Sequence, residues 1–274
     1  MLSAAQHKNA ALWIALAALA VGIGISANAL KGHITEIKPV YLAAVLVTVP
    51  LSIVLSSYRF RLVAALAGTT LAFPRCLRTV VLGTAVNFLP VPGGFAVRVH
   101  ALRHVGVKKS VYVNVFATLA WLIASSLLAF AGAYALGTGA AAGVFAGLAA
   151  VCAVIAAAFM HRHAYPLGRV AALFAVQSVI SGIDISRMVL IAYALSISLG
   201  LAGASVLGLA GVIGTMTGIM PSGIGITESV GALLLLAIGA SAATGFLITA
   251  LNRLSLWIGI APAAVYLLRQ HHDD

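Results

Sequence analysis

Long apolar runs alternate with short polar segments along nearly the whole chain. Six runs are long enough to cross the hydrocarbon core of a bilayer, which takes about 20 helical residues; they cover residues 10–30, 40–57, 110–130, 140–160, 170–199 and 243–268. The first run ends near a signal-peptide-like Ala-Asn-Ala, but it exceeds the roughly 7–15 residues of a signal core, so we expect an uncleaved anchor. The pattern predicts an all-α polytopic membrane protein with about six full transmembrane helices.

The composition strengthens this interpretation. Of the 274 residues, 62% are hydrophobic and 8% are charged, and the mean hydropathy is +1.13. Soluble domains carry roughly a quarter charged residues, so this chain has too few polar groups to cover a globular surface. A water-soluble enzyme is therefore excluded, and we interpret residues 1–274 as a single integral membrane domain.

The charge is strongly basic, with 16 Lys and Arg against 5 Asp and Glu. In a membrane protein this excess reports orientation, because Lys and Arg are retained in cytoplasmic loops. Sparse aromatic residues do not interleave with a basic patch, so no nucleic-acid partner is expected. We assign to the cytoplasmic side both termini and one large basic group, which comprises Arg59, Arg61, Arg75, Arg78, Arg98, Arg103, Lys108 and Lys109.

Residues 79–97 are apolar, yet basic residues of that cytoplasmic group flank them on both sides. A helix from 79 to 89 would rise only ~16 Å, about half the hydrocarbon thickness, before prolines and glycines break it. These features predict a re-entrant hairpin over 79–97 that enters and leaves from the cytoplasm. Non-helical backbone at this depth must be buried in protein or line a wet cavity.

The second half of the chain repeats this arrangement. The run 202–239 is interrupted at 220–228, and the directions of the neighbouring spans predict a hairpin that dips from the outside. The order span, span, hairpin, span thus occurs twice, which predicts an inverted repeat of residues 1–135 and 136–274. Paired interruptions in corresponding places indicate a transporter site at the repeat interface.

The first interruption supplies one group of candidate substrate-binding residues. The half-helix after the break presents backbone N–H groups and a positive dipole end, which suit a phosphate, and Arg98 one turn further could bind it bidentately. Alternatively, Arg98 only reaches toward cytoplasmic headgroups. The candidates here are Asn87, Pro90, Pro92, Gly93, Gly94 and Arg98.

The second interruption places Glu228 at membrane depth. A carboxylate there costs about 2.5–3.5 kcal/mol, more than a helix dipole usually returns, so it needs a basic partner or a cationic substrate group. Arg253 is the first candidate partner and Arg98 the second; a simple helix cap is the alternative. The substrate-binding candidates here are Pro221, Ser222, Gly223, Gly225, Thr227, Glu228 and Arg253.

Asp184 and Arg187 lie three residues apart in a predicted span and hence on one helical face. They form either a structural ion pair or part of a polar cavity lining. His100 and His104 have no acidic residue or cysteine near them in sequence, and the two cysteines lie far apart, so neither a metal site nor a cofactor is predicted.

The two interruptions also carry a family resemblance. The stretch TAVNFLPVPGGFAVRVHALRHVG, followed in the second half by IMPSGIGITES and LNRLSLW, resembles the lysylphosphatidylglycerol synthase transmembrane-region family. This family includes the flippase part of multiple peptide resistance factors and stand-alone flippase-like proteins. The resemblance covers most of the chain, and 221–228 is its more specific motif. It implies a multi-pass protein of a bacterial or archaeal cytoplasmic membrane that moves or binds a modified lipid.

The chain departs from that family in two respects. No aminoacyl-transferase domain follows the last span, so lysine transfer is not expected of this chain alone, and a separate lipid synthase is a candidate partner. Members often carry charged residues early in the span after the first hairpin, where this chain has Asn114. The sequence leaves the oligomeric state open.

These observations together predict a lipid flippase or lipid-binding carrier rather than an enzyme. The expected substrate is a phosphate-containing lipid, which could be aminoacylated, glycosylated or isoprenoid. Two alternatives stay open. One is an integral-membrane enzyme acting on polyprenyl phosphates, although neither predicted hairpin tip contains the histidine such chemistry would want. The other is a non-transporting scaffold for a lipid synthase.

Overall fold

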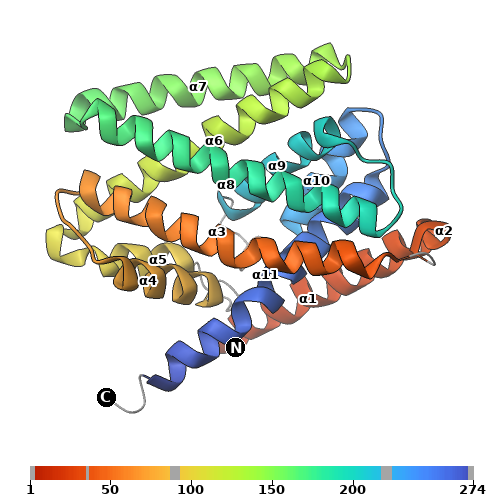
Figure 1. Cartoon of the computed structure of the whole chain (residues 1–274), viewed down its shortest axis with the longest axis horizontal. Coiled ribbons are helices and arrows are strands. Elements are labelled where there is room, and N and C mark those ends of the chain that lie inside the picture. Colours follow the sequence, from red (N-terminus) through yellow and green to blue (C-terminus); the bar gives the residue numbers. More distant parts are fainter. Residues whose placement is uncertain (1–3, 35–36, 87–92, 217–223, 271–274) are drawn as a thin grey trace.

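A computed structural model describes residues 4–34, 37–86, 93–216 and 224–270 (Figure 1). All the regular structure in these ranges is helical, as predicted. The elements in chain order are α1 (Ala4–Ala29), α2 (Lys31–Ile34), α3 (Pro39–Leu66), α4 (Phe73–Val86), α5 (Gly93–Ala101), the 3-10 turn η1 (Arg103–Val105), α6 (Val107–Ala135), α7 (Gly139–His163), α8 (Leu167–Ala194), α9 (Leu201–Met216), α10 (Ile226–Ala237) and α11 (Ala242–Gln270).

Long apolar helices form the body of the molecule. Within the described ranges, α3, α6, α7, α8 and α11 are long and apolar enough to cross a membrane. Helix α1, with 26 residues, is of comparable length. The prediction of an all-α polytopic membrane protein is therefore confirmed.

Helix α3 extends well beyond the predicted span 40–57. It continues to Leu66 and ends where Gly68 adopts a φ of +81° and the Thr69 N–H bonds to the Ala64 carbonyl. A left-handed glycine ends a helix, whereas a charged side chain leaves the backbone hydrogen bonds intact. Arg59, expected just beyond the end of the span, therefore lies inside α3.

Both interrupted stretches form pairs of short helices. Helices α4 and α5 have 14 and 9 residues, and α9 and α10 have 16 and 12. At 1.5 Å per residue, the longest rises about 24 Å, less than the ~30 Å hydrocarbon core. The members of each pair pack on each other; Gly214 of α9, for example, lies against Thr227 of α10, where any larger residue would clash. The intervening residues 87–92 and 217–223 lie outside the described ranges.

Helices α3 and α8 run antiparallel at the centre. Near one end the Lys38 N–H donates to the Ala194 carbonyl at 2.9 Å, and near the other Arg169 Nη1 donates to the Ala65 carbonyl at 2.7 Å. Helix α4 follows one end of this pair and α9 follows the other, so the two short-helix pairs begin at opposite ends of the molecule (Figure 1).

The packing of the helices is the same in both halves of the chain. Helix α6 packs on α7, α9 and α8, and α11 packs correspondingly on α1, α4 and α3. The lengths also agree: α3 and α8 each have 28 residues, and α6 and α11 each have 29. The helices of the first half and their counterparts in the second half thus have equivalent packing partners.

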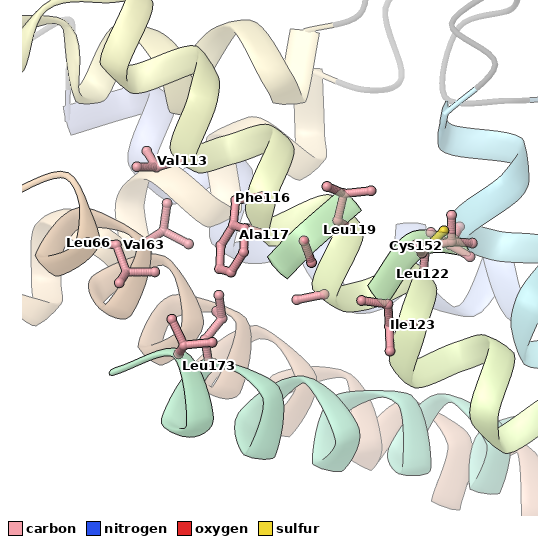
Figure 2. Packing of buried hydrophobic residues seen from close by; sticks show 14 of the residues in the cluster. Val63, Leu66, Val113, Phe116, Ala117, Leu119, Leu122, Ile123, Cys152 and Leu173 are labelled. Atoms are coloured by element: carbon pink, nitrogen blue, oxygen red, sulfur yellow. The ribbon is translucent and has the colours of Figure 1, made fainter. Parts of the chain in front are cut away.

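The largest apolar core joins α6 to its neighbours. Figure 2 shows Phe116 and Ala117 of α6 together with Val63 of α3 and Leu173 of α8. The Phe116 side chain is fully buried, and its ring centroid lies 5.1 Å from that of Tyr165. This core lies beside the cavity described next and fixes the helices that form its walls.

Candidate functional site

A cavity of about 610 Å³ lies among the helices. Its walls come from α3, α6, α8 and α11, and both short-helix pairs contribute: Thr84 and Gly94 from the first, Thr215 and Thr227 from the second. Much of the lining is apolar, and a few polar and charged side chains project between the apolar ones. Such a mixture is typical of sites that bind amphiphilic ligands.

Among the described residues, four charged side chains line the cavity, namely Arg59, Arg98, Arg253 and Asp184. Arg59 donates from Nη1 to Gln177 Oε1 at 2.6 Å, and its guanidinium lies 6.0 Å from the Trp121 ring centroid. Gln177 in turn donates to the Ser181 hydroxyl at 3.3 Å. These contacts hold the Arg59 side chain across the α3–α8 interface.

Arg98 projects into the cavity from α5. It is the sixth residue of that helix, and its Nε atom is buried without a hydrogen-bond partner among the described residues. Gly94, one turn earlier, also lines the cavity, and Gly93 lies buried beside it. Of the first group of candidates, Gly93, Gly94 and Arg98 are thus placed at or beside the cavity, whereas Asn87, Pro90 and Pro92 lie outside the described residues.

Glu228 and Arg253 form a buried ion pair. Arg253 Nε lies 2.7 Å from Glu228 Oε1, and the other carboxylate oxygen, Oε2, accepts the Gly225 N–H at 2.8 Å. Glu228 is fully buried, while Arg253 reaches the cavity wall. The expected partner of Glu228 is therefore found. Thr227 lines the cavity as well, and Pro221, Ser222 and Gly223 lie outside the described residues.

Asp184 and Arg187 pair through Oδ1 and Nη2 on one face of α8. Arg187 is fully buried and also donates to the Ser52 hydroxyl of α3 at 3.0 Å, whereas Asp184 keeps 27% of its side-chain surface exposed and lines the cavity. Both interpretations of this pair therefore apply: it joins α8 to α3, and its carboxylate forms part of the lining.

The positions of the cavity-lining residues repeat between the two halves of the chain. Two residues correspond when they have the same number counted from the start of their helices. Corresponding places in α3 and α8 supply Val49 and Gln177, Ser52 and Ile180, Ser56 and Asp184, and Phe60 and Met188. Corresponding places in α6 and α11 supply Asn114 and Thr249, Ala117 and Asn252, Thr118 and Arg253, and Trp121 and Leu256. Arg59 and Arg187 are likewise each the twenty-first residue of their helices.

Sequence reasoning missed several polar residues of this cavity. Arg59 was hidden at the end of an apolar run, and Asn114 drew attention only as a departure from a family pattern. Gln177, Asn252 and Trp257 carried no signal, since single polar or aromatic residues in a span do not reveal which face they occupy. In the described part of the chain no cluster of three or more His, Cys, Asp or Glu residues could hold a metal ion.

Comparison with known proteins also identifies a membrane protein. A search of curated proteins gives no match. Residues 10–263 match the family described as "Lysylphosphatidylglycerol synthase TM region", which covers nearly the whole chain. This membrane protein, with a partly polar cavity between two pairs of short helices, belongs to the lysylphosphatidylglycerol synthase transmembrane-region family.

Proposed function

We propose that the chain is a lipid flippase or lipid-binding carrier for a phosphate-containing lipid. Membership of the family and the apolar helices establish a membrane setting and a lipid-related role. The observation that carries the finer proposal is the cavity of about 610 Å³, because it combines three arginines with apolar walls inside a membrane protein. Charged groups inside the hydrocarbon region of a membrane are costly and usually mark a substrate path.

The proposal includes two re-entrant hairpins, α4–α5 and α9–α10, that dip from opposite sides of the membrane. Their helices are too short to span the hydrocarbon core, and they begin at opposite ends of the antiparallel α3–α8 pair. The shared packing pattern and the repeated lining support an inverted repeat of 1–135 and 136–274. In transporters of this type the substrate lies where the repeats meet.

Each charged group has a distinct role in this proposal. Arg98 and the start of α5 bind phosphate through guanidinium and backbone N–H donors. Arg253 contacts the rest of the headgroup, while Glu228, which is buried behind it, fixes its orientation. The acyl chains remain in the surrounding lipid.

We also propose the cytoplasmic membrane as the location, with both termini on the cytoplasmic side. Helix α1 begins and α11 ends toward the same end of the molecule as α4 and α5 (Figure 1). The basic residues near α4 and α5 would lie on that side under the positive-inside rule. A separate lipid synthase remains a proposed partner.

Filling the cavity tests the proposal. Gly211 lines the cavity, and a Cβ built there meets no atom within 4 Å, so Gly211→Phe should occupy the headgroup space without a backbone clash. Gly143→Phe is the matched control, because Gly143 is also helical and open but is exposed on α7. In reconstituted vesicles, we expect Gly211→Phe to abolish movement of a fluorescent phospholipid and Gly143→Phe to preserve it. Wild-type movement by Gly211→Phe would contradict the proposal.

Accessibility labelling tests the hairpin topology. Arg75 at the start of α4 and Arg103 after α5 are both exposed, and the native Cys76 and Cys152 are buried. Single-cysteine variants at 75 and 103 should react with a membrane-impermeant maleimide from the same side. Labelling from opposite sides would mean that 79–97 forms an ordinary crossing.

The proposal assigns transport rather than catalysis to the cavity. Its lining contains neither histidine nor cysteine in the described part of the chain. Release of phosphate from a polyprenyl phosphate by the purified protein would favour the enzyme instead. Capture of a lipid synthase by a protein that moves no lipid would favour a scaffold.

A further inference from the structure

The charges around the cavity do not balance. Of the five carboxylic residues in the sequence, Asp184 and Glu228 lie in the described ranges, and each is paired with an arginine, Arg187 and Arg253 respectively. Each pair is neutral as a unit. The remaining carboxylates, Glu36, Asp273 and Asp274, lie outside the described residues.

Two lining arginines are therefore left without a carboxylate in the described structure. Arg59 donates to the neutral amide of Gln177 and lies over the Trp121 ring; Asp184 attracts it electrostatically, but that carboxylate is hydrogen-bonded to Arg187. The buried Nε of Arg98 has no hydrogen-bond partner among the described residues. The two guanidinium groups also act on each other electrostatically, although they come from different helices. The cavity thus presents two positive charges that face one space.

The chemistry of the two arginines limits which lipid headgroups the cavity would bind. Arginine binds phosphate oxygens through paired N–H donors, and two arginines together match a group with two negative charges. A phosphodiester lipid such as phosphatidylglycerol has one negative charge, and an aminoacylated phosphatidylglycerol is neutral or net positive, depending on the amino acid. Neither would neutralise both Arg59 and Arg98.

We propose that the cavity selects a lipid whose headgroup carries two negative charges on phosphate, namely a phosphomonoester or a diphosphate. This inference rests on the proposed lipid-binding function and narrows it. Trp121, Leu256 and the other apolar lining residues would contact the first part of the lipid beyond the phosphate. The neutral polar side chains of Asn114, Thr118 and Gln177 complete the polar wall.

A competition experiment tests this selectivity. The purified full chain is incubated at pH 8 with equal amounts of dioleoyl phosphatidic acid, which is a phosphomonoester, and dioleoyl phosphatidylglycerol, and bound lipid is read by native mass spectrometry. We expect at least about tenfold more phosphatidic acid, a difference of ~1.4 kcal/mol. The preference should shrink toward pH 5, because the second phosphate ionisation has a pKa of about 6.

Variants identify the groups responsible. Arg59→Gln and Arg98→Gln should each remove most of the preference, and Arg59→Lys should retain more of it than Arg59→Gln because the charge remains. Arg61→Gln is the matched control, since Arg61 lies two residues from Arg59 on the exposed side of α3. Circular dichroism checks that each variant remains folded. An unchanged preference in folded Arg59→Gln and Arg98→Gln variants would overturn the inference.

The same experiment separates the possible failures. Binding or movement of lipids without regard to charge would overturn this inference and leave the proposed function intact. The absence of lipid binding and movement altogether would overturn both. If inorganic phosphate displaced phosphatidic acid at equal concentration, the site would be one for free phosphate, and the assignment to a lipid would be wrong.

Discussion

Removal of the carboxylate at position 228 should destabilise the protein strongly. In Glu228→Gln, the Arg253 guanidinium keeps its charge but loses its carboxylate partner, in a place where its side chain is only 10% exposed. Breaking a buried pair by removing one partner typically costs about 3–5 kcal/mol. The Gly225 N–H also loses its bond to a charged acceptor.

Removing both members of the pair should cost less than the two single changes together. In the double variant Glu228→Gln, Arg253→Gln, two neutral amides replace the charges, and no uncompensated charge remains. Because residues in direct contact show coupling of about 0.5–3 kcal/mol, we expect the double variant to recover part of the stability lost in Glu228→Gln.

Thermal unfolding in detergent, followed by circular dichroism, measures both effects. Glu228→Gln should lower the unfolding midpoint by about 10 °C, whereas Arg61→Gln, which removes an exposed arginine 6.0 Å from the Tyr58 ring, should change it little. If Glu228→Gln unfolded at the control midpoint, or if the single changes were simply additive, the pair would not contribute as argued. A folded double variant that moves no lipid would then separate the role in transport from the role in stability.

The other ion pair and the tryptophans give two further predictions. Asp184→Asn should destabilise the protein more than Arg187→Gln does, because it strands a fully buried guanidinium, whereas Arg187→Gln leaves a carboxylate that is 27% exposed; comparison of the two unfolding midpoints checks this order, and the reverse order would refute it. Added phosphatidic acid should alter the fluorescence of Trp121 and Trp257, which line the cavity. This fluorescence change should persist in Trp13→Phe, because Trp13 is exposed, and should decrease in Trp121→Phe. An identical fluorescence change in both variants would contradict headgroup binding in the cavity.

The sequence predicts the helical body of this protein well. A run of 20 apolar residues has few alternatives to a membrane helix, and a buried carboxylate requires a partner wherever it lies. This second argument led from Glu228 to Arg253, 25 residues away, without knowledge of the fold. It succeeded because the chain has very few acidic residues, so the number of pairings was small.

The cavity was harder to predict, and Arg59 shows why. Hydropathy falls where charges begin, but a helix ends where its backbone turns, which for α3 is at Gly68. A guanidinium near the end of an apolar run can therefore lie at the surface or project inward, and only the packing of α3 against α8 distinguishes these cases. The lining amides Gln177 and Asn252 depend on the same tertiary information.

The matched positions of Arg59 and Arg187 have a consequence for changes of shape. In this conformation Arg59 faces the cavity, whereas Arg187 is sealed between α8 and α3 at the other end of the antiparallel pair. If the two halves exchanged conformations, Arg187 would face the cavity and Arg59 would be sealed between α3 and α8. Each half of the chain would then adopt the conformation that the other half has in this structure.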